Sequence, residues 1–188
     1  MASQTLSGKR VAFLVAPEGI EQVELTEPWK AVEAAGGSPE LLSTDSGEVQ
    51  AFNHLDKADT FPVDRTVGEA DASDYDGLVL PGGVANPDFL CTDEDAVAFV
   101  RAFFEQAKPV AAICHAPWTL IEADVVKGKR VASWPSLQTD IRNAGGEWVD
   151  DKVVTDGNLI TSRNPDDLPA FTNALLEALD HGAAGTSL

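Results

Sequence analysis

Short apolar runs alternate with stretches of helical periodicity along the chain, and this alternation is the feature that most restricts the fold. It predicts strands at 10–16, 41–43, 77–80, 109–113 and 130–133, with a strand pair within 153–162. Helical spacing fills the intervals, at 23–35, 94–105, 117–123, 137–144 and 166–179. Strands that alternate with helices in this way build a mostly parallel sheet covered by helices. The sequence therefore predicts an α/β protein.

Residues 44–75 break this alternation. They are rich in Asp and Gly with only short apolar patches, and we expect a strand or hairpin excursion there. No internal repeat or long linker interrupts the chain, and its 188 residues with 44% hydrophobic content suit one compact core. We therefore expect a single domain over 1–188, with a core of about 10–180 and short flexible tails.

The formal net charge of −18 restricts the partners. Nucleic acid and anionic membrane surfaces both require a basic footprint, so neither is expected as a partner. A well-solvated, self-repelling surface is the simplest interpretation, and a high-salt environment or a cationic partner is the alternative. No apolar run is long enough to span a bilayer, and the N-terminus lacks a signal-peptide pattern, so a cytoplasmic location is expected.

Two cysteines, Cys91 and Cys114, are too few for a disulfide framework, and they form no CxxC pair. Both are expected to be free thiols in a reducing compartment. No metal-ligand cluster or nucleotide-binding loop is present in the sequence, so we expect no metal and no cofactor.

The sharpest motif surrounds one of these cysteines and reads Val110-Ala111-Ala112-Ile113-Cys114-His115-Ala116-Pro117. An apolar strand delivers Cys114 into a helix start, at the carboxyl edge of the sheet, where open α/β folds place their sites. Helix N–H groups and the positive end of the dipole would favour the thiolate, so we expect a pKa for Cys114 below the ordinary 8.5. The alternative is a small hydrophobe in the core, and Cys91 is interpreted in that structural way.

Two further segments follow predicted strands. One is Leu80-Pro81-Gly82-Gly83, whose glycines can leave N–H groups open to an anionic oxygen. Beside a nucleophilic cysteine this turn suggests an oxyanion hole, although an ordinary tight turn has the same composition. The other is Glu18-Gly19-Ile20-Glu21-Gln22-Val23-Glu24-Leu25, with several carboxylates. One of them can lean over the sulfur, and spacing alone does not choose which.

Taken together, these motifs resemble the ThiJ/PfpI superfamily, which includes intracellular PfpI-type peptidases and protein deglycases. The resemblance extends from near Arg10 to near Leu179 and includes Arg142-Asn143-Ala144-Gly145-Gly146-Glu147-Trp148-Val149-Asp150 and Val154-Thr155-Asp156-Gly157-Asn158-Leu159-Ile160-Thr161-Ser162-Arg163. It implies a flavodoxin-like three-layer sandwich with a mostly parallel sheet, related to class I glutamine amidotransferases.

The resemblance also implies roles for particular residues. Cys114 would be the nucleophile, Glu21 the carboxyl that hydrogen-bonds its sulfur, and Gly83 and His115 the two N–H donors of the oxyanion hole. Asp88 would be the acid of a Cys-His-acid set, supplied in such proteins often by a neighbouring subunit. The loop around Asp88 is one residue longer than the archaeal PfpI pattern and carries Asp in place of Glu. Because the acid in such proteins often comes from a neighbouring subunit, the resemblance also implies a homo-oligomer, a dimer or larger.

Three activities are compatible with these residues. The leading hypothesis is a stress-protective hydrolase or lyase acting on small reactive aldehydes or glycated proteins, of the glyoxalase III or protein deglycase type. The alternatives are an intracellular cysteine peptidase that uses Cys114, His115 and Asp88, and a redox sensor that responds through oxidation of Cys114. A glutamine amidotransferase is disfavoured, because His181 is the only late histidine and no His-x-Glu pair follows Cys114.

Overall fold

The computed structural model describes residues 5–182. A seven-stranded sheet forms its centre, in the spatial order β11 (Val154–Asp156), β12 (Leu159–Ser162), β8 (Val110–Ile113), β7 (Gly77–Leu80), β1 (Arg10–Val15), β3 (Ser38–Ser43), β6 (Arg65–Thr66). Neighbouring strands are parallel except at β11, which runs antiparallel to β12.

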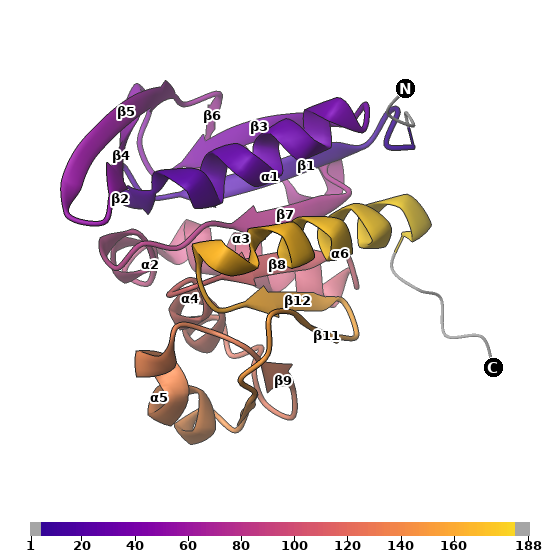
Figure 1. Cartoon of the computed structure of the whole chain (residues 1–188). Coiled ribbons are helices and arrows are strands. Elements are labelled where there is room, and N and C mark those ends of the chain that lie inside the picture. The colour runs from indigo at the N-terminus through magenta and orange to yellow at the C-terminus, as the bar shows by residue number, and fades with distance from the viewer. Residues whose placement is uncertain (1–4, 183–188) are drawn as a thin grey trace.

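Helices cover both faces of this sheet (Figure 1). Helices α1 (Gln22–Ala34) and α6 (Leu168–His181) lie side by side on one face. Helices α3 (Glu94–Glu105) and α4 (Pro117–Glu122) cover the other, where α2 (Ala85–Leu90) and α5 (Gln138–Asn143) pack against α4. Four short 3-10 helices lie in the connections, namely η1 (Val67–Glu69), η2 (Ala72–Asp74), η3 (Pro135–Leu137) and η4 (Pro165–Asp167).

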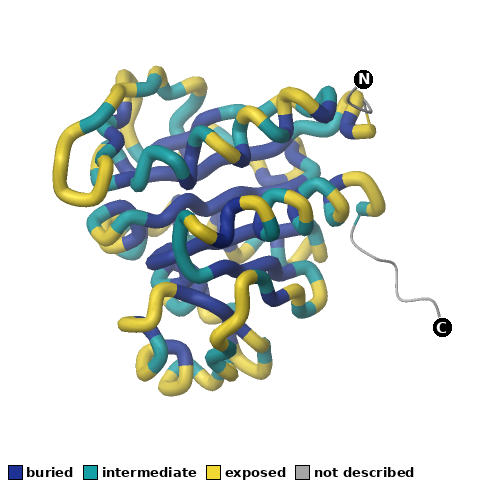
Figure 2. Tube along the Cα trace, in the orientation of Figure 1, coloured by how far each residue is buried: buried dark blue, intermediate teal, exposed yellow. Residues whose placement is uncertain are grey.

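The central strands are buried on both sides, which is why their sequences read as continuous apolar runs (Figure 2). Along β1, Val11 and Phe13 join the core beneath α1 and α6, whereas Ala12 and Leu14 join the core beneath α3 and α4. The side chains of a strand alternate between faces, so one run of apolar residues serves two cores. The predicted α/β class and the flavodoxin-like three-layer arrangement are confirmed.

Two smaller sheets flank the main one. The first contains β2 (Glu18–Glu21), β4 (Glu48–Asn53) and β5 (Asp56–Pro62), and the second pairs β9 (Arg130–Val131) with β10 (Glu147–Trp148). The antiparallel β4–β5 pair confirms the hairpin expected within 44–75. Strand β2 was not predicted, because it forms only by parallel pairing with β4, which follows much later in the chain.

Helix α2 was not predicted either, because the residues around Asp88 were interpreted as a loop. Pro87 occupies the first turn of α2, where the missing N–H has no helical partner to lose. The predicted flexible tails include 1–4 and 183–188, which lie outside the described residues. Between residues 5 and 182, no helix is both long and apolar enough to cross a membrane.

Candidate active site

Cys114 stands at a sharp elbow between β8 and α4. Its φ of 64° lies in the left-handed region, which is unusual for a residue with a side chain. Two backbone hydrogen bonds hold this conformation: the N–H of Cys114 donates to the carbonyl of Ser162 (3.1 Å), and the N–H of Trp134 donates to the carbonyl of Cys114 (2.9 Å). Strain of this kind persists only where the surroundings impose it. The elbow thereby presents the sulfur at the carboxyl edge of the sheet.

Two backbone N–H groups converge on the sulfur, from Gly83 and from His115. Gly83 follows β7 with a φ of 86°, and a Cβ at this position would overlap the carbonyl oxygen of Gly19. Only glycine fits this turn, so the donor position depends on it. The structure therefore places near one sulfur the two N–H groups that the family resemblance assigned to an oxyanion hole.

The carboxyl group beside the sulfur belongs to Glu24, in the first turn of α1. Glu24 is fully buried, and its Oε2 accepts a hydrogen bond from the N–H of Gly82 at 2.8 Å. Its other oxygen, Oε1, is buried without a hydrogen-bond partner among the described residues, and its carboxyl is close enough to Cys114 to influence the pKa of the thiol. Burial raises the pKa of Glu24 to about 8, and the nearby charge of Glu21 adds to this rise. The carboxyl is therefore mainly protonated at neutral pH and can donate a hydrogen bond.

The assignment of this position to Glu21 was wrong. Glu21 is the last residue of β2, and its Oε2 accepts a hydrogen bond from the N–H of His54 (3.1 Å) and lies 3.9 Å from Nδ1 of the same residue. Its side chain lines the cleft without replacing Glu24 at the sulfur. The cause is the unpredicted strand β2, which directs Glu21 towards the β4–β5 turn and leaves the inward helical position to Glu24.

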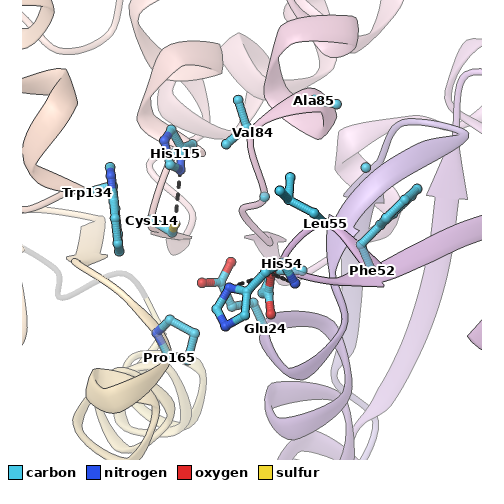
Figure 3. Close-up of a pocket in the computed structure, with 13 residues that line it drawn as sticks. Glu24, Phe52, His54, Leu55, Val84, Ala85, Cys114, His115, Trp134 and Pro165 are labelled. Carbon is cyan, nitrogen blue, oxygen red and sulfur yellow. Dashed lines mark hydrogen bonds and ion pairs between the residues drawn. The ribbon is translucent and has the colours of Figure 1, made fainter. Parts of the chain in front are cut away.

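The imidazole of His115 contacts the sulfur directly, with Nδ1 at 3.1 Å from Sγ (Figure 3). Burial lowers the pKa of His115, so the neutral ring is favoured at neutral pH. Trp134 stacks on this ring with a centroid distance of 5.7 Å and an interplanar angle of 22°. Trp118 packs at 5.2 Å from it in a tilted geometry. Neither tryptophan was identified from the sequence. Trp134 lies in a segment distant from the motif, and Trp118 directly follows the motif in α4 but carries no local sign of its contact with the ring.

The expected direction of the Cys114 pKa was also wrong. Burial raises the pKa of this thiol, and the charge of an ionised Glu24 raises it further. The N–H groups of Gly83 and His115 act in the opposite direction, as the sequence predicted, but they are outweighed. Cys114 is only 6% exposed, so lost hydration dominates over the nearby dipoles. The resting group is a thiol beside a neutral imidazole.

Asp88 lies outside this constellation within one chain. It is exposed on α2 and does not line the cleft around Cys114. Its charge acts instead on Cys91, where it contributes to a raised pKa. A role for Asp88 in the site of a neighbouring chain stays a prediction.

A residue two positions earlier supports the site in a way that the sequence did not reveal. Asn86 is fully buried on α2, and its Nδ2 donates to the carbonyls of Pro81 (2.9 Å) and Gly82 (3.1 Å). Its Oδ1 accepts a hydrogen bond from the N–H of Ala16 at 2.7 Å. Asn86 therefore ties the glycine turn to the end of β1. A buried side-chain amide needs such hydrogen-bond partners. The sequence did not reveal this role, because the partners of Asn86 belong to other segments.

A cleft of about 400 Å³ opens above the sulfur. Its walls come from the β4–β5 turn, the glycine turn, the Cys114 elbow and the segments before η3 and α6 (Figure 3). Apolar side chains form much of this lining: Phe52, Leu55, Val84, Ala85, Trp134 and Pro165. The cleft leads directly to Sγ and its donors, which makes it the candidate active site.

A flavodoxin-like sheet that presents a buried cysteine at a strand-to-helix elbow, between two N–H donors and a carboxyl, defines a class of α/β proteins with a cysteine-centred site. Residues 9–178 match the DJ-1/PfpI family, and the chain belongs to that family.

Relatives cover nearly the whole chain. It is 40% identical over 171 residues to a Bacillus subtilis protein named "Putative cysteine protease YraA", covering 91% of this chain and 98% of the relative. It is 37% identical over 172 residues to "Protein/nucleic acid deglycase 2" of Escherichia coli, covering 91% and 98%. A crystal structure from Anabaena variabilis, with DJ-1/ThiJ/PfpI-like and ferritin-like domains, superposes with a TM-score of 0.87 at 36% identity. The match covers 95% of this chain and half of that one.

Proposed function

We propose that the protein is a cysteine-dependent enzyme that acts on reactive carbonyls, by converting α-oxoaldehydes such as methylglyoxal or by releasing early glycation adducts from proteins. The observation that carries this proposal is the surrounding of Cys114: a neutral imidazole nitrogen 3.1 Å from Sγ, two backbone N–H donors and a protonated carboxyl. The deglycase name of a relative that is 37% identical supports the same chemistry.

The first step forms a bond between sulfur and the aldehyde carbon. Nδ1 of His115 accepts the thiol proton as Sγ attacks, so the raised pKa of Cys114 need not be overcome before the substrate arrives. The carbonyl electrons move to oxygen, where the N–H groups of Gly83 and His115 stabilise the negative charge. Glu24 holds the proton that this oxygen needs, and a neutral hemithioacetal results.

For methylglyoxal, the second step moves one proton from the former aldehyde carbon to the ketone carbon, and the hydroxyl proton passes from the oxygen on the former aldehyde carbon to the ketone oxygen. The aldehyde carbon is thereby oxidised and the ketone carbon reduced, which leaves a lactoyl thioester on Cys114. Water then hydrolyses the thioester to lactate and the free thiol, so no external oxidant is needed. For a hemiaminal on a protein amine, sulfur displaces nitrogen instead, and the amine leaves with the thiol proton.

Steady-state assays on methylglyoxal, a glycated peptide and a denatured protein test this proposal. We expect stoichiometric lactate from methylglyoxal or free amine from the peptide, with both lost in Cys114→Ala and retained in the matched variant Cys91→Ala. Cleavage of the denatured protein alone would favour the peptidase. The absence of all turnover, with a stable oxidised Cys114 at low peroxide, would favour the redox sensor.

The peptidase remains the second candidate, because the relative at 40% identity carries a protease name. It requires an acid to orient His115, as in other Cys-His sites. Asp88 does not supply that acid within one chain. We further propose a homo-oligomer in which a neighbouring chain brings Asp88 to the site. Because the net charge is −18, we also propose that neither nucleic acid nor a membrane surface is a partner.

A further inference from the structure

Most of the large apolar side chains that remain exposed are gathered around one opening. Among residues 5–182 they are Leu55 (94% exposed), Val84 (59%), Phe89 (43%) and Trp134 (41%). All except Phe89 line the cleft above Cys114. Scattered exposed hydrophobics need no explanation, but a cluster at the mouth of a pocket is typical of ligand binding.

The same opening carries no side chain with a fixed positive charge. Neither Lys nor Arg is among the described residues that line it. The carboxyl groups of Glu21 and Glu24 face it instead, and His54 lies beside Glu21. Because Glu24 is mainly protonated, an incoming carboxylate would meet the negative charge of Glu21 without a Lys or Arg to compensate it, in a chain whose net charge is already −18.

We propose that this mouth selects uncharged carbonyl compounds with an apolar substituent, such as aryl or branched alkyl glyoxals, over α-oxo acids such as glyoxylate. Trp134 places its indole against the His115 ring at 5.7 Å, beside the atoms that would hold the aldehyde. A substituent on that aldehyde would extend between Trp134, Val84 and Leu55. The catalytic form of this preference rests on the proposed carbonyl activity, whereas the binding preference belongs to the cleft itself.

Alkylation of Cys114 tests the binding preference without any assumption about turnover. Three reagents carry the same reactive group, an iodomethyl carbon next to a carbonyl: iodoacetate, iodoacetamide and N-phenyliodoacetamide. In each, Sγ displaces iodide and the thiol proton passes to His115 or solvent. Rates at pH 7.5 are divided by those of N-acetylcysteine amide, a neutral thiol without a cleft, and Cys114 is followed by mass spectrometry of its peptide. We expect about tenfold faster modification by the phenyl reagent and about tenfold slower modification by iodoacetate, each relative to iodoacetamide.

Substitutions at the cleft opening test whether its side chains cause the preference among the three reagents. Leu55→Ser and Trp134→Ala should each reduce the phenyl preference, and Glu21→Gln should reduce the exclusion of iodoacetate. Phe89→Ser is the matched control, because it removes an exposed apolar side chain that does not line this cleft. Leu55 is almost fully exposed, so its replacement does not endanger folding. Equal normalised rates for the three reagents, or an equal effect of Phe89→Ser, would overturn the proposal.

Turnover of phenylglyoxal, methylglyoxal and glyoxylate gives the catalytic counterpart. We expect kcat/KM to fall in that order. Activity on all three without this order would overturn the selectivity while leaving the carbonyl activity intact. A protein that shows the alkylation preference but converts none of them would refute the proposed reaction and leave the apolar, anion-excluding mouth established.

Discussion

The two cysteines of this chain occupy opposite kinds of environment. Burial raises the pKa of both, to about 11 for Cys91. Cys91 follows α2 in a helical conformation and is flanked by the charges of Glu122 and Asp88. Cys114 instead occupies a left-handed elbow that faces two N–H donors, a protonated carboxyl and an imidazole.

This difference shows that an exposed or readily ionised thiol is not what defines the site. Cys114 is the more deeply buried of the two. Its advantage is a proton acceptor within reach and donors aimed at the charge that develops during attack. Cys91 has carboxylates near it, which oppose that charge. Reactivity is therefore expected to follow the arrangement of partners and not the degree of exposure.

The largest expected effect is the loss of carbonyl turnover in Cys114→Ser. We expect kcat/KM to fall by at least about 10³-fold, because a serine hydroxyl is a far weaker nucleophile at this site. The thermal midpoint should change little, since the replacement is nearly isosteric. Cys91→Ser should keep more than half of the activity. If both variants lost activity equally, the distinction between the two cysteines would fail.

The second prediction concerns Glu24 and stability. The folded protein retains the proton of Glu24 up to a pKa of about 8, whereas the unfolded chain loses it near 4.5. The free energy of unfolding should therefore fall as pH rises from 4.5 to 8, and Glu24→Gln removes this contribution. Relative to wild type, the variant should gain stability over this interval by up to about 4 kcal/mol.

Urea unfolding of both proteins at several pH values from 5 to 9 measures this difference. The comparison isolates Glu24, because both proteins keep His115 and the other titratable groups. Glu21→Gln serves as the matched control, since its carboxyl is not the one buried against the sulfur. Parallel stability profiles for wild type and Glu24→Gln would contradict a protonated Glu24.

The smallest effect within one chain is expected for Asp88→Ala. Asp88 is exposed near Cys91, so a monomer should keep its activity within about twofold. If a neighbouring chain brings Asp88 to His115, the loss should exceed about tenfold and should appear only at concentrations where the protein associates. Sedimentation at micromolar concentration, combined with the assay, separates these results. A strict monomer with full activity would refute the shared site.

Local patterns predicted the frame of the site well. Cys114 directly follows strand β8, and the glycine pair closely follows strand β7. Each of these strands is buried and parallel, so it appears in the sequence as an apolar run. The participation of Asn86 and Trp134 was not predictable in this way. The role of Asn86 depends on its hydrogen bonds to the glycine turn and to Ala16. The role of Trp134 depends on its stacking on His115.

The sequence by itself determined the α/β architecture, the cysteine at one strand end and the glycine pair at another, because each depends on a run of neighbouring residues, whereas the pairing of Gly83 and His115 as donors came from the family resemblance. Only the tertiary structure decided which carboxyl meets the sulfur and whether burial or the N–H dipoles control the pKa of Cys114. Glu21 and Glu24 are equivalent candidates in the sequence, but pairing of β2 with β4 directs one outward and leaves the other buried. Desolvation depends on everything packed around a group, and that information is spread over segments far apart in the chain.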